Sequence, residues 1–136
     1  MTDSRLVIPV PRGEDDEPPV LQVVATDVTE GLAVVEVRGD LDTLTATGFD
    51  RWVREQLEGH TDVVLDLDHV AFLASAGIAA LIKLRQEAAR LGMRLHVTGR
   101  GNRAVRRPLQ VLGLETIMEL RDDDARAVVA QLVTSS

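Results

Sequence analysis

Ser75 is the residue best placed to carry chemistry, because it stands between a predicted strand and a predicted helix. It is the only hydroxyl residue between Thr61 and Thr98, and apolar residues recur at helical spacing from Ile78 onward. A helix start leaves backbone N–H groups unpaired and carries partial positive charge, so it favours a hydroxyl oxygen and favours a phosphate more. Ser75 is therefore either a simple N-cap, worth about 1 kcal/mol, or a position suited to a phosphate group.

A catalytic role for Ser75 would need a neighbouring base and a strained nucleophile turn. The Gly-x-Ser-x-Gly pattern is incomplete, because Leu73 stands at the first glycine and only Gly77 is present. The chain has three histidines, none at a motif spacing to Ser75: His60, His69 and His96. The sequence predicts a protein that is not an enzyme.

Two other groups of residues suggest ligand binding and are better explained structurally. Four aspartates suggest a divalent metal: Asp40, Asp42, Asp66 and Asp68. The first two fall at a strand-to-helix turn, where aspartate is favoured, and no Asp-x-Asp-x-Asp-Gly loop is present. The stretch 99–102 before a basic helix lacks the Gly-Lys-Ser/Thr ending of a phosphate loop. We therefore expect neither a metal nor a cofactor. The arginines near this stretch are expected to form a solvated helix face or part of a protein-binding rim: Arg100, Arg103, Arg106 and Arg107.

Composition narrows the function classes further. The formal net charge is -7 and aromatic residues make up 2% of the chain, so neither nucleic acid nor an anionic membrane is an expected partner. Cysteine is absent, which excludes disulfides and thiolate metal sites. The N-terminal stretch lacks the pattern of a signal peptide, and no apolar run is long enough to span a bilayer. We expect a cytoplasmic protein.

The elements that must position Ser75 follow in the order β-β-α-β-α-β-α-β-α, which predicts an α/β fold with a mixed sheet of about five strands and about four helices. Residues 1–19, rich in proline and acids, are expected to form a flexible tail before a domain at 20–134. The expected elements are a hairpin within 20–38, a helix from Asp42 or Thr45 to about Leu57, a strand at Val63–Leu67, a helix at Ser75–Leu91, a strand at Met93–Val97, a helix capped by Asn102, a short strand at Thr116–Leu120 and a last helix after Asp122–Asp124.

The helix after Asn102 carries two further expectations. Its buried stripe should consist of Val105, Leu109 and Leu112. Pro108 removes a backbone hydrogen bond and crowds the preceding turn, so we expect a kink or a later helix start.

Three segments together resemble the STAS domain, and more narrowly the anti-sigma factor antagonists of bacteria. They are GDLDTLTA at 39–46, VVLDLDHVAFLASAGIAAL at 63–81, and the basic stretch from Asn102 to Arg107 that ends in Leu112-Gly113-Leu114. These correspond to the family's GELD-x-x-TA, DLS-x-V-x-F-x-DSSG and late basic helix. The resemblance covers about Val20 to Leu132 and implies a small sheet packed with helices, with the motif serine exposed at the start of the second helix.

The resemblance also implies a function for single positions. Ser75 aligns on the serine that a partner anti-sigma factor kinase phosphorylates, and Asp42 and Thr45 align on the family's aspartate and threonine. Ala74 and Ala76 stand where the family has aspartate and a second serine. The implied partner surface consists of Asp42, Thr45, Ala74, Ser75, Ala76, Gly77, Ile78, Arg103 and Arg106. Binding to the anti-sigma factor, itself a serine kinase, would release the sigma factor that it holds. Phosphorylation of Ser75 would switch off this binding and a phosphatase would restore it, in a protein expected to be a monomer or a weak dimer.

Two alternatives remain open at this point. One is a constitutive STAS interaction subunit, a partner of a transporter or a lipid-trafficking complex, in which Ser75 is only a helix cap; Ala74 favours it. The other is a nucleotide-binding or other small-molecule-binding module that uses the region from Gly99 to Arg107.

Overall fold

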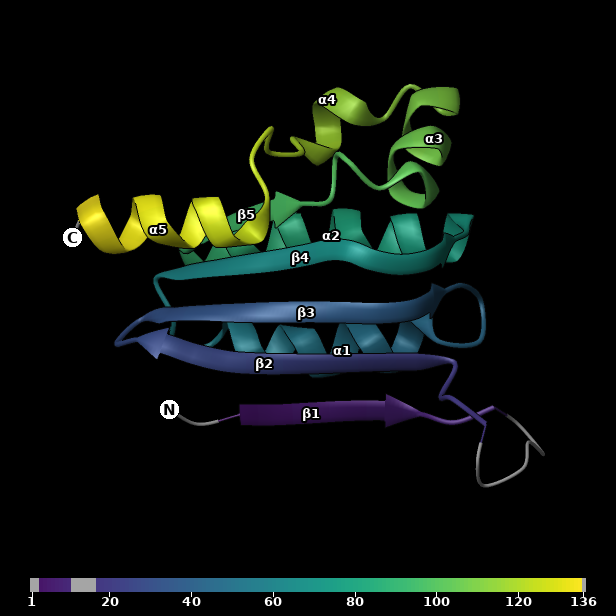
Figure 1. Ribbon diagram of the computed structural model, residues 1–136, viewed down its shortest axis with the longest axis horizontal. Coiled ribbons are helices and arrows are strands. Elements are labelled where there is room, and N and C mark those ends of the chain that lie inside the picture. The colour runs from purple at the N-terminus through teal and green to yellow at the C-terminus, as the bar shows by residue number, and fades with distance from the viewer. Residues whose placement is uncertain (1–2, 11–16, 136) are drawn as a thin grey trace.

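Within the described residues, five strands form one mixed sheet in the order β1-β2-β3-β4-β5. A computed structural model describes residues 3–10 and 17–135. The strands are β1 (Asp3–Ile8), β2 (Leu21–Thr29), β3 (Leu32–Leu41), β4 (Asp62–Leu73) and β5 (Arg94–Thr98). The pairs β1–β2 and β2–β3 are antiparallel, whereas β3, β4 and β5 run parallel to one another, so the carboxyl ends of these three strands lie at one edge of the molecule (Figure 1). The predicted fold class is confirmed.

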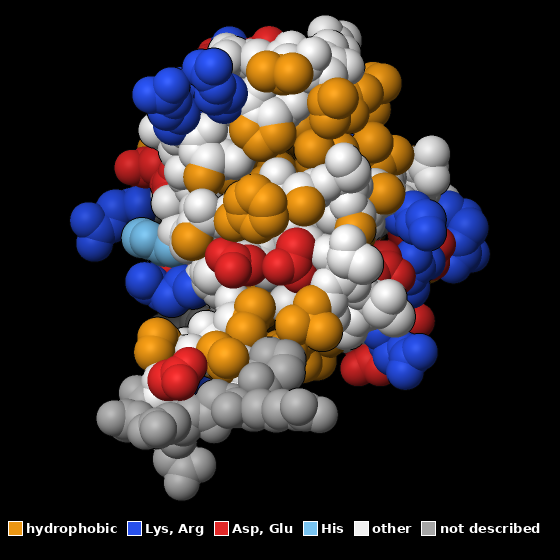
Figure 2. Space-filling model, turned by 90° about the vertical axis from the view of Figure 1, so that its right-hand side faces the viewer, with side chains coloured by type: hydrophobic (Ala, Val, Ile, Leu, Met, Phe, Trp, Pro, Cys, Tyr) orange, Lys and Arg blue, Asp and Glu red, His pale blue; other side chains and the backbone are white. Residues whose placement is uncertain are grey.

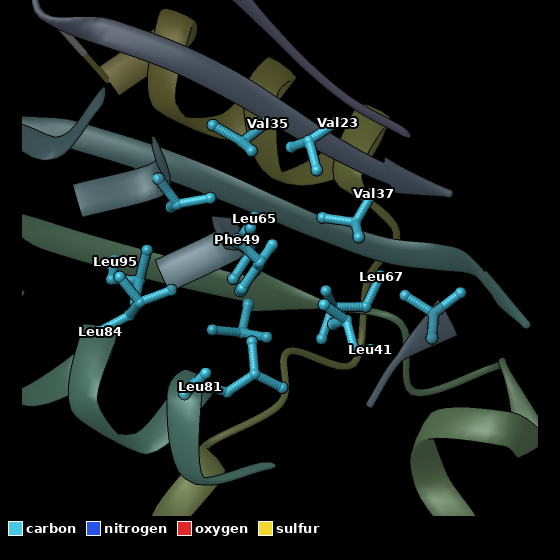
Figure 3. Close-up of a cluster of buried hydrophobic side chains, with 14 of the residues drawn as sticks. Val23, Val35, Val37, Leu41, Phe49, Leu65, Leu67, Leu81, Leu84 and Leu95 are labelled. Carbon is cyan, nitrogen blue, oxygen red and sulfur yellow. The ribbon is translucent and has the colours of Figure 1, made fainter. Parts of the chain in front are cut away.

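Helices supply the parallel crossovers and cover one face of the sheet. Helix α1 (Ala46–Leu57) joins β3 to β4, and α2 (Ser75–Leu91) joins β4 to β5, as the apolar spacing predicted. Figure 3 shows the core between them: valines and leucines of the strands meet Phe49 of α1 and Leu81 and Leu84 of α2. Since these side chains are almost fully buried, the core holds both crossover helices on the sheet.

Three more helices follow β5. They are α3 (Arg103–Val111), α4 (Glu115–Met118) and α5 (Ala125–Ser135). Helices α3 and α4 lie beyond the β5 edge, while α5 covers only part of the second sheet face (Figure 1). There Leu32, Val64, Ala125 and Val128 form a smaller apolar cluster. Strand β4 is therefore buried on both faces over its first half, as its continuous apolar run predicted.

The N-terminal segment corrects one expectation. Residues 3–8 are not part of a flexible tail but form β1, paired in register with β2 from Asp3↔Thr26 to Ile8↔Leu21. Leu6 and Ile8 alternate along the strand and both pack against the main core, which stabilises the pairing of β1 with β2. The acidic residues 14–16 lie outside the described residues.

The C-terminal third corrects two more expectations. Residues 116–120 are not a strand: residues 115–118 form α4, in which buried Met118 packs on the core while Arg85 of α2 donates a hydrogen bond to its carbonyl at 2.7 Å. The edge of β5 is instead met by Arg121, whose amide donates to the Val97 carbonyl at 2.9 Å. Leu112 is 53% exposed and does not belong to the buried stripe of α3.

Two local predictions concern where elements begin and end. The strand predicted at Val63–Leu67 is longer, because β4 continues without interruption from Asp62 to Leu73, although its pairing with β3 shifts register twice. Helix α3 begins directly after Asn102, so the later start considered for Pro108 is wrong, and the proline lies within the helix.

Candidate functional site

The turn between β3 and α1 is held by the Asp42 and Thr45 side chains. Asp42 Oδ1 accepts the amides of Leu44 at 3.0 Å and Thr45 at 3.2 Å. The Thr45 hydroxyl donates to the Asp40 carbonyl at 2.7 Å and accepts the Asp42 amide at 3.1 Å. Thr45 is fully buried, so it cannot touch a partner and acts as an internal clamp of the turn. Asp42 is partly exposed and remains at the surface.

The junction between β4 and α2 presents Ser75 to solvent. The Ala74 amide donates to the Leu41 carbonyl at 2.9 Å, and the Ala74 carbonyl accepts the Ile78 amide at 3.0 Å. Ala74 is thus the N-cap of α2, with no side-chain cap. Ser75 is exposed, and its hydroxyl makes no hydrogen bond with any residue that the structure describes. The expectation that Ser75 is a simple N-cap is therefore wrong.

The start of α2 has the electrostatics of an anion site. Its first turn holds no acidic residue, and the amides of residues 75–77 have no carbonyl partner within the helix. Such free amides and the partial positive charge of the helix end stabilise a negative group on the first residue. A phosphate on Ser75 would therefore be stabilised within the protein itself.

Gly77 seats this first turn against the end of β3. A Cβ atom at Gly77 would lie 2.5 Å from the Leu41 carbonyl oxygen and 2.8 Å from Leu41 Cβ. Gly77 is buried and Ile78 is 3% exposed, with its side chain in the main core. Both were expected at the partner surface, and their burial corrects this: they pack inside the domain and support the turn that carries Ser75. Ala74 and Ala76, half-buried beside Ser75, remain accessible.

Asn102 attaches α3 to the strand that leads into Ser75. Pairing of β4 with β5 ends at Asp66↔Thr98, so beyond this point β4 is paired only with β3, and its carbonyls on the opposite side have no strand partner. Asn102 Nδ2 donates to three of them, those of Leu67 at 2.9 Å, Asp68 at 3.1 Å and Val70 at 2.8 Å. Its Oδ1 accepts the amide of Ala104 at 3.0 Å, the predicted N-cap bond. Sequence reasoning found the cap but missed the three carbonyls, because they belong to a strand more than thirty residues away.

An apolar groove of about 570 Å³ lies between the end of β4 and α3. Residues 71–73 form one wall and α3 the other, and three large hydrophobic side chains are exposed there: Phe72 at 54%, Val111 at 74% and Leu112 at 53%. Figure 2 shows this end of the molecule, with hydrophobic side chains gathered over its upper half beside Lys and Arg side chains. Leu73 at the end of the groove is two residues before Ser75, so the groove and Ser75 lie at the same end of β4.

The arginines of the predicted rim differ in their partners. Arg100 pairs with Asp122 at 2.8 Å, and Arg106 donates to the Arg100 carbonyl at 3.0 Å. Arg103 and Arg107 line the apolar groove, and neither has an ion-pair partner among residues 3–10 and 17–135. The loop before α3 uses its own polar groups internally, since the Asn102 amide bonds to the Gly99 carbonyl at 2.9 Å. This arrangement does not favour a phosphate loop.

The histidines are engaged away from Ser75. His60 contacts Asp27 at 2.9 Å, and His96 lies between Asp62 at 2.9 Å and Arg121 at 3.1 Å. Asp62 begins β4, at the strand end opposite to Ser75. A hydrogen bond from Arg94 is the main cause that lowers the pKa of Asp62 to about 2.

His69 is the third histidine, and with Glu36 and Asp66 it brings three potential ligand atoms within 4.8 Å of one another. Burial raises the pKa of Asp66. Asp40 and Asp42 lie outside this group, so the four aspartates considered together in the sequence do not converge. A Ser–His pair is likewise absent from the part of the chain that the structure describes.

Comparison with known proteins identifies the fold. The family model of the STAS domain matches residues 23–127. The chain belongs to the STAS domain family. An anti-sigma factor antagonist from Mycobacterium paratuberculosis is 26% identical, with a TM-score of 0.69 over 81% of this chain and 92% of that one. The anti-sigma factor antagonist SpoIIAA in its unphosphorylated form has 16% identity and a TM-score of 0.67, over 82% of this chain and 96% of that one.

A protein from a transporter family is also similar in structure. A sulfate transporter family protein from Wolinella succinogenes has 19% identity and a TM-score of 0.64, over 82% of this chain and 93% of that one. A search of curated proteins found no match. Within the described residues of this STAS domain, every helix is too short or too polar to cross a bilayer.

Proposed function

We propose that this STAS domain is an anti-sigma factor antagonist that binds an anti-sigma factor with serine kinase activity, and that phosphorylation of Ser75 switches this binding off. The observation that carries the proposal is the position of Ser75: exposed, first in α2, with an unpaired hydroxyl above a turn of free amides. The 26% identity with the Mycobacterium paratuberculosis antagonist supports the same function.

The switch has a simple electrostatic basis. A phosphoserine adds a charge of about -1.5 to -2 and three acceptor oxygens. The start of α2 stabilises this charge in the free protein, whereas a docked partner would bury it beside the carboxylate of Asp42, at the end of the neighbouring strand. A difference of about 1–3 kcal/mol in binding free energy would change partner occupancy by roughly one to two orders of magnitude.

The partner surface follows from exposure. Ser75, Ala76 and Asp42 are accessible, while Phe72, Val111 and Arg103 extend the same face along the groove. Thr45, Gly77 and Ile78 support this surface from inside. The surface is preformed, since Asn102, the Asp42 turn and the Gly77 contact tie its three segments together.

The test is phosphorylation by candidate anti-sigma kinases. The purified protein is incubated with each kinase and ATP, beside Ser75→Ala and a control, Thr43→Ala, which removes an exposed hydroxyl from the neighbouring turn. Intact mass spectrometry should show a phosphate-sized gain on the parent and the Thr43 variant and none on Ser75→Ala. Binding to the kinase, measured by calorimetry, should weaken at least tenfold once Ser75 is phosphorylated.

A constitutive interaction subunit is the second candidate, favoured by Ala74 at the position of the family's aspartate. Under this function a kinase homologue or another protein would bind the Ser75 face without modifying it. Equal partner affinity for the parent and a Ser75→Asp variant, together with no mass gain, would establish this second function in place of the switch.

A further inference from the structure

The groove between β4 and α3 exposes more apolar surface than the fold requires. Phe72, Val111 and Leu112 are each more than half exposed, although the core contains other large apolar residues that are fully buried. Exposed apolar patches with a polar rim mark interaction sites on soluble proteins. The volume of about 570 Å³ is that of a site for side chains or a small ligand.

The charge at the rim of the groove has one sign. Arg103 and Arg107 lie one helical turn apart on the same side of α3, and among the residues that the structure describes no acidic one lines the groove. Neither arginine is neutralised within the described residues, although the chain has 22 acidic side chains against 15 basic ones. Two unpaired guanidinium groups beside an apolar surface complement carboxylates that flank an apolar side chain.

We propose that this groove binds an acidic amphipathic segment of the anti-sigma factor, with an apolar side chain between Phe72 and Val111 and carboxylates on Arg103 and Arg107. This inference rests on the proposed function and adds the chemistry of the partner to it. It also strengthens the switch, because phosphoserine at 75 would repel an acidic segment that docks at the same end of β4.

A membrane surface fits the groove less well. A chain with net charge -7 is repelled by anionic lipid, and two arginines supply little attraction against that. A second copy of the chain would have to bring an acidic segment of its own to the groove. The resulting dimer would be detected by sedimentation.

The first experiment uses a random dodecapeptide phage library, panned on the parent and on Val111→Asp. Val111 is 74% exposed, so the substitution should leave the fold intact while placing a carboxylate in the groove. The expected result is enrichment of peptides that combine a large apolar residue with Asp or Glu, on the parent alone. Equal enrichment on both proteins, or enriched sequences without an acidic excess, would overturn the proposal.

The second experiment reverses the charges. Fluorescence polarisation of the best enriched peptide should show binding at least tenfold weaker to the double variant Arg103→Glu, Arg107→Glu. A peptide with lysines in place of its acids should recover binding to that variant. The matched control, Arg51→Glu with Arg126→Glu, makes the same change in net charge on exposed residues of α1 and α5 and should bind like the parent. Equal losses in both double variants would refute recognition by the groove.

The outcomes separate this inference from the proposed function. Phosphorylation of Ser75 with no groove-dependent peptide leaves the switch standing and overturns the acidic segment. Acidic peptides that need the groove, without phosphorylation by any kinase, support the docking site and remove the switch. If the parent sediments as a dimer and Val111→Asp as a monomer, the occupant is a second copy and the proposal is wrong.

Discussion

Gly77→Ala is the sharpest test of how α2 is seated under Ser75. The added Cβ would approach the Leu41 carbonyl oxygen to 2.5 Å, Leu41 Cβ to 2.8 Å and the Leu41 carbonyl carbon to 2.9 Å. Two of these atoms are backbone atoms of Leu41 and the third, Cβ, is bonded directly to that backbone, so none can move without shifting the end of β3. The substitution should push the first turn of α2 away from β3.

The magnitude is the difference between two opposing effects. Overpacking against backbone costs about 3 kcal/mol, the upper end of the usual range. Alanine is the better helix former by about 1 kcal/mol, which offsets part of this cost. The free energy of unfolding should therefore fall by about 2 kcal/mol.

The control is Gly48→Ala, a second glycine within a helix. Its Cβ would meet only the Ile8 Cδ1 atom, at 3.4 Å and at the end of a flexible side chain. Helix propensity then dominates, and the free energy of unfolding should rise by about 0.5–1 kcal/mol. The two variants make the same chemical change and should differ by about 3 kcal/mol with opposite signs.

Urea unfolding followed by far-UV circular dichroism is the assay. With a slope of about 1–3 kcal/mol/M for a domain of this size, Gly77→Ala should lower the midpoint by roughly 1 M while Gly48→Ala raises it. A Gly77→Ala midpoint at or above that of the parent would show that the start of α2 does not lie against Leu41. The account of how Ser75 is positioned would then fail.

The remaining predictions concern polar groups that hold the same strands. Asn102→Ala removes an N-cap and the donor to three β4 carbonyls, so urea unfolding should show a loss of about 3 kcal/mol, and a loss below 1 kcal/mol would contradict that role. Asp62 has a pKa of about 2 because Arg94 binds its carboxylate; its stabilisation is present above the ordinary value of 3.8 and is lost as the pH falls toward 2. Asp62→Asn should therefore lower the urea midpoint at pH 7 and flatten its decline between about pH 4 and pH 2. Burial raises the pKa of Asp66, so the effect of this carboxylate on stability is opposite to that of Asp62: its charged form destabilises the fold above its ordinary pKa. Asp66→Asn should therefore raise the urea midpoint at pH 7, and a lower midpoint would refute this.

Much of the fold could be predicted because local patterns and tertiary packing agree over most of the chain. The α1 and α2 helices, the hairpin of β2 and β3, and the cap at Asn102 all follow from spacing and capping residues. The errors fall where local signals are weak. Four-residue α4 is too short to show a helical period, and β1 has only two core-facing residues within a segment rich in proline and acids.

The candidate site likewise has features that could be predicted from the sequence and features that could not. Residue types and their spacing were enough to predict that Ser75 begins a helix after a buried strand, that no histidine stands at a catalytic spacing to it, and that the chain is acidic. These properties depend on residue type and on spacing along the chain. The folded chain was needed to see that Ile78 and Thr45 are buried, that Leu112 and Phe72 line an open groove, and which arginines have no ion-pair partner among the described residues. Exposure and charge pairing depend on contacts between segments far apart in the sequence, such as Arg100 with Asp122 and α3 with β4, and no local pattern encodes those contacts.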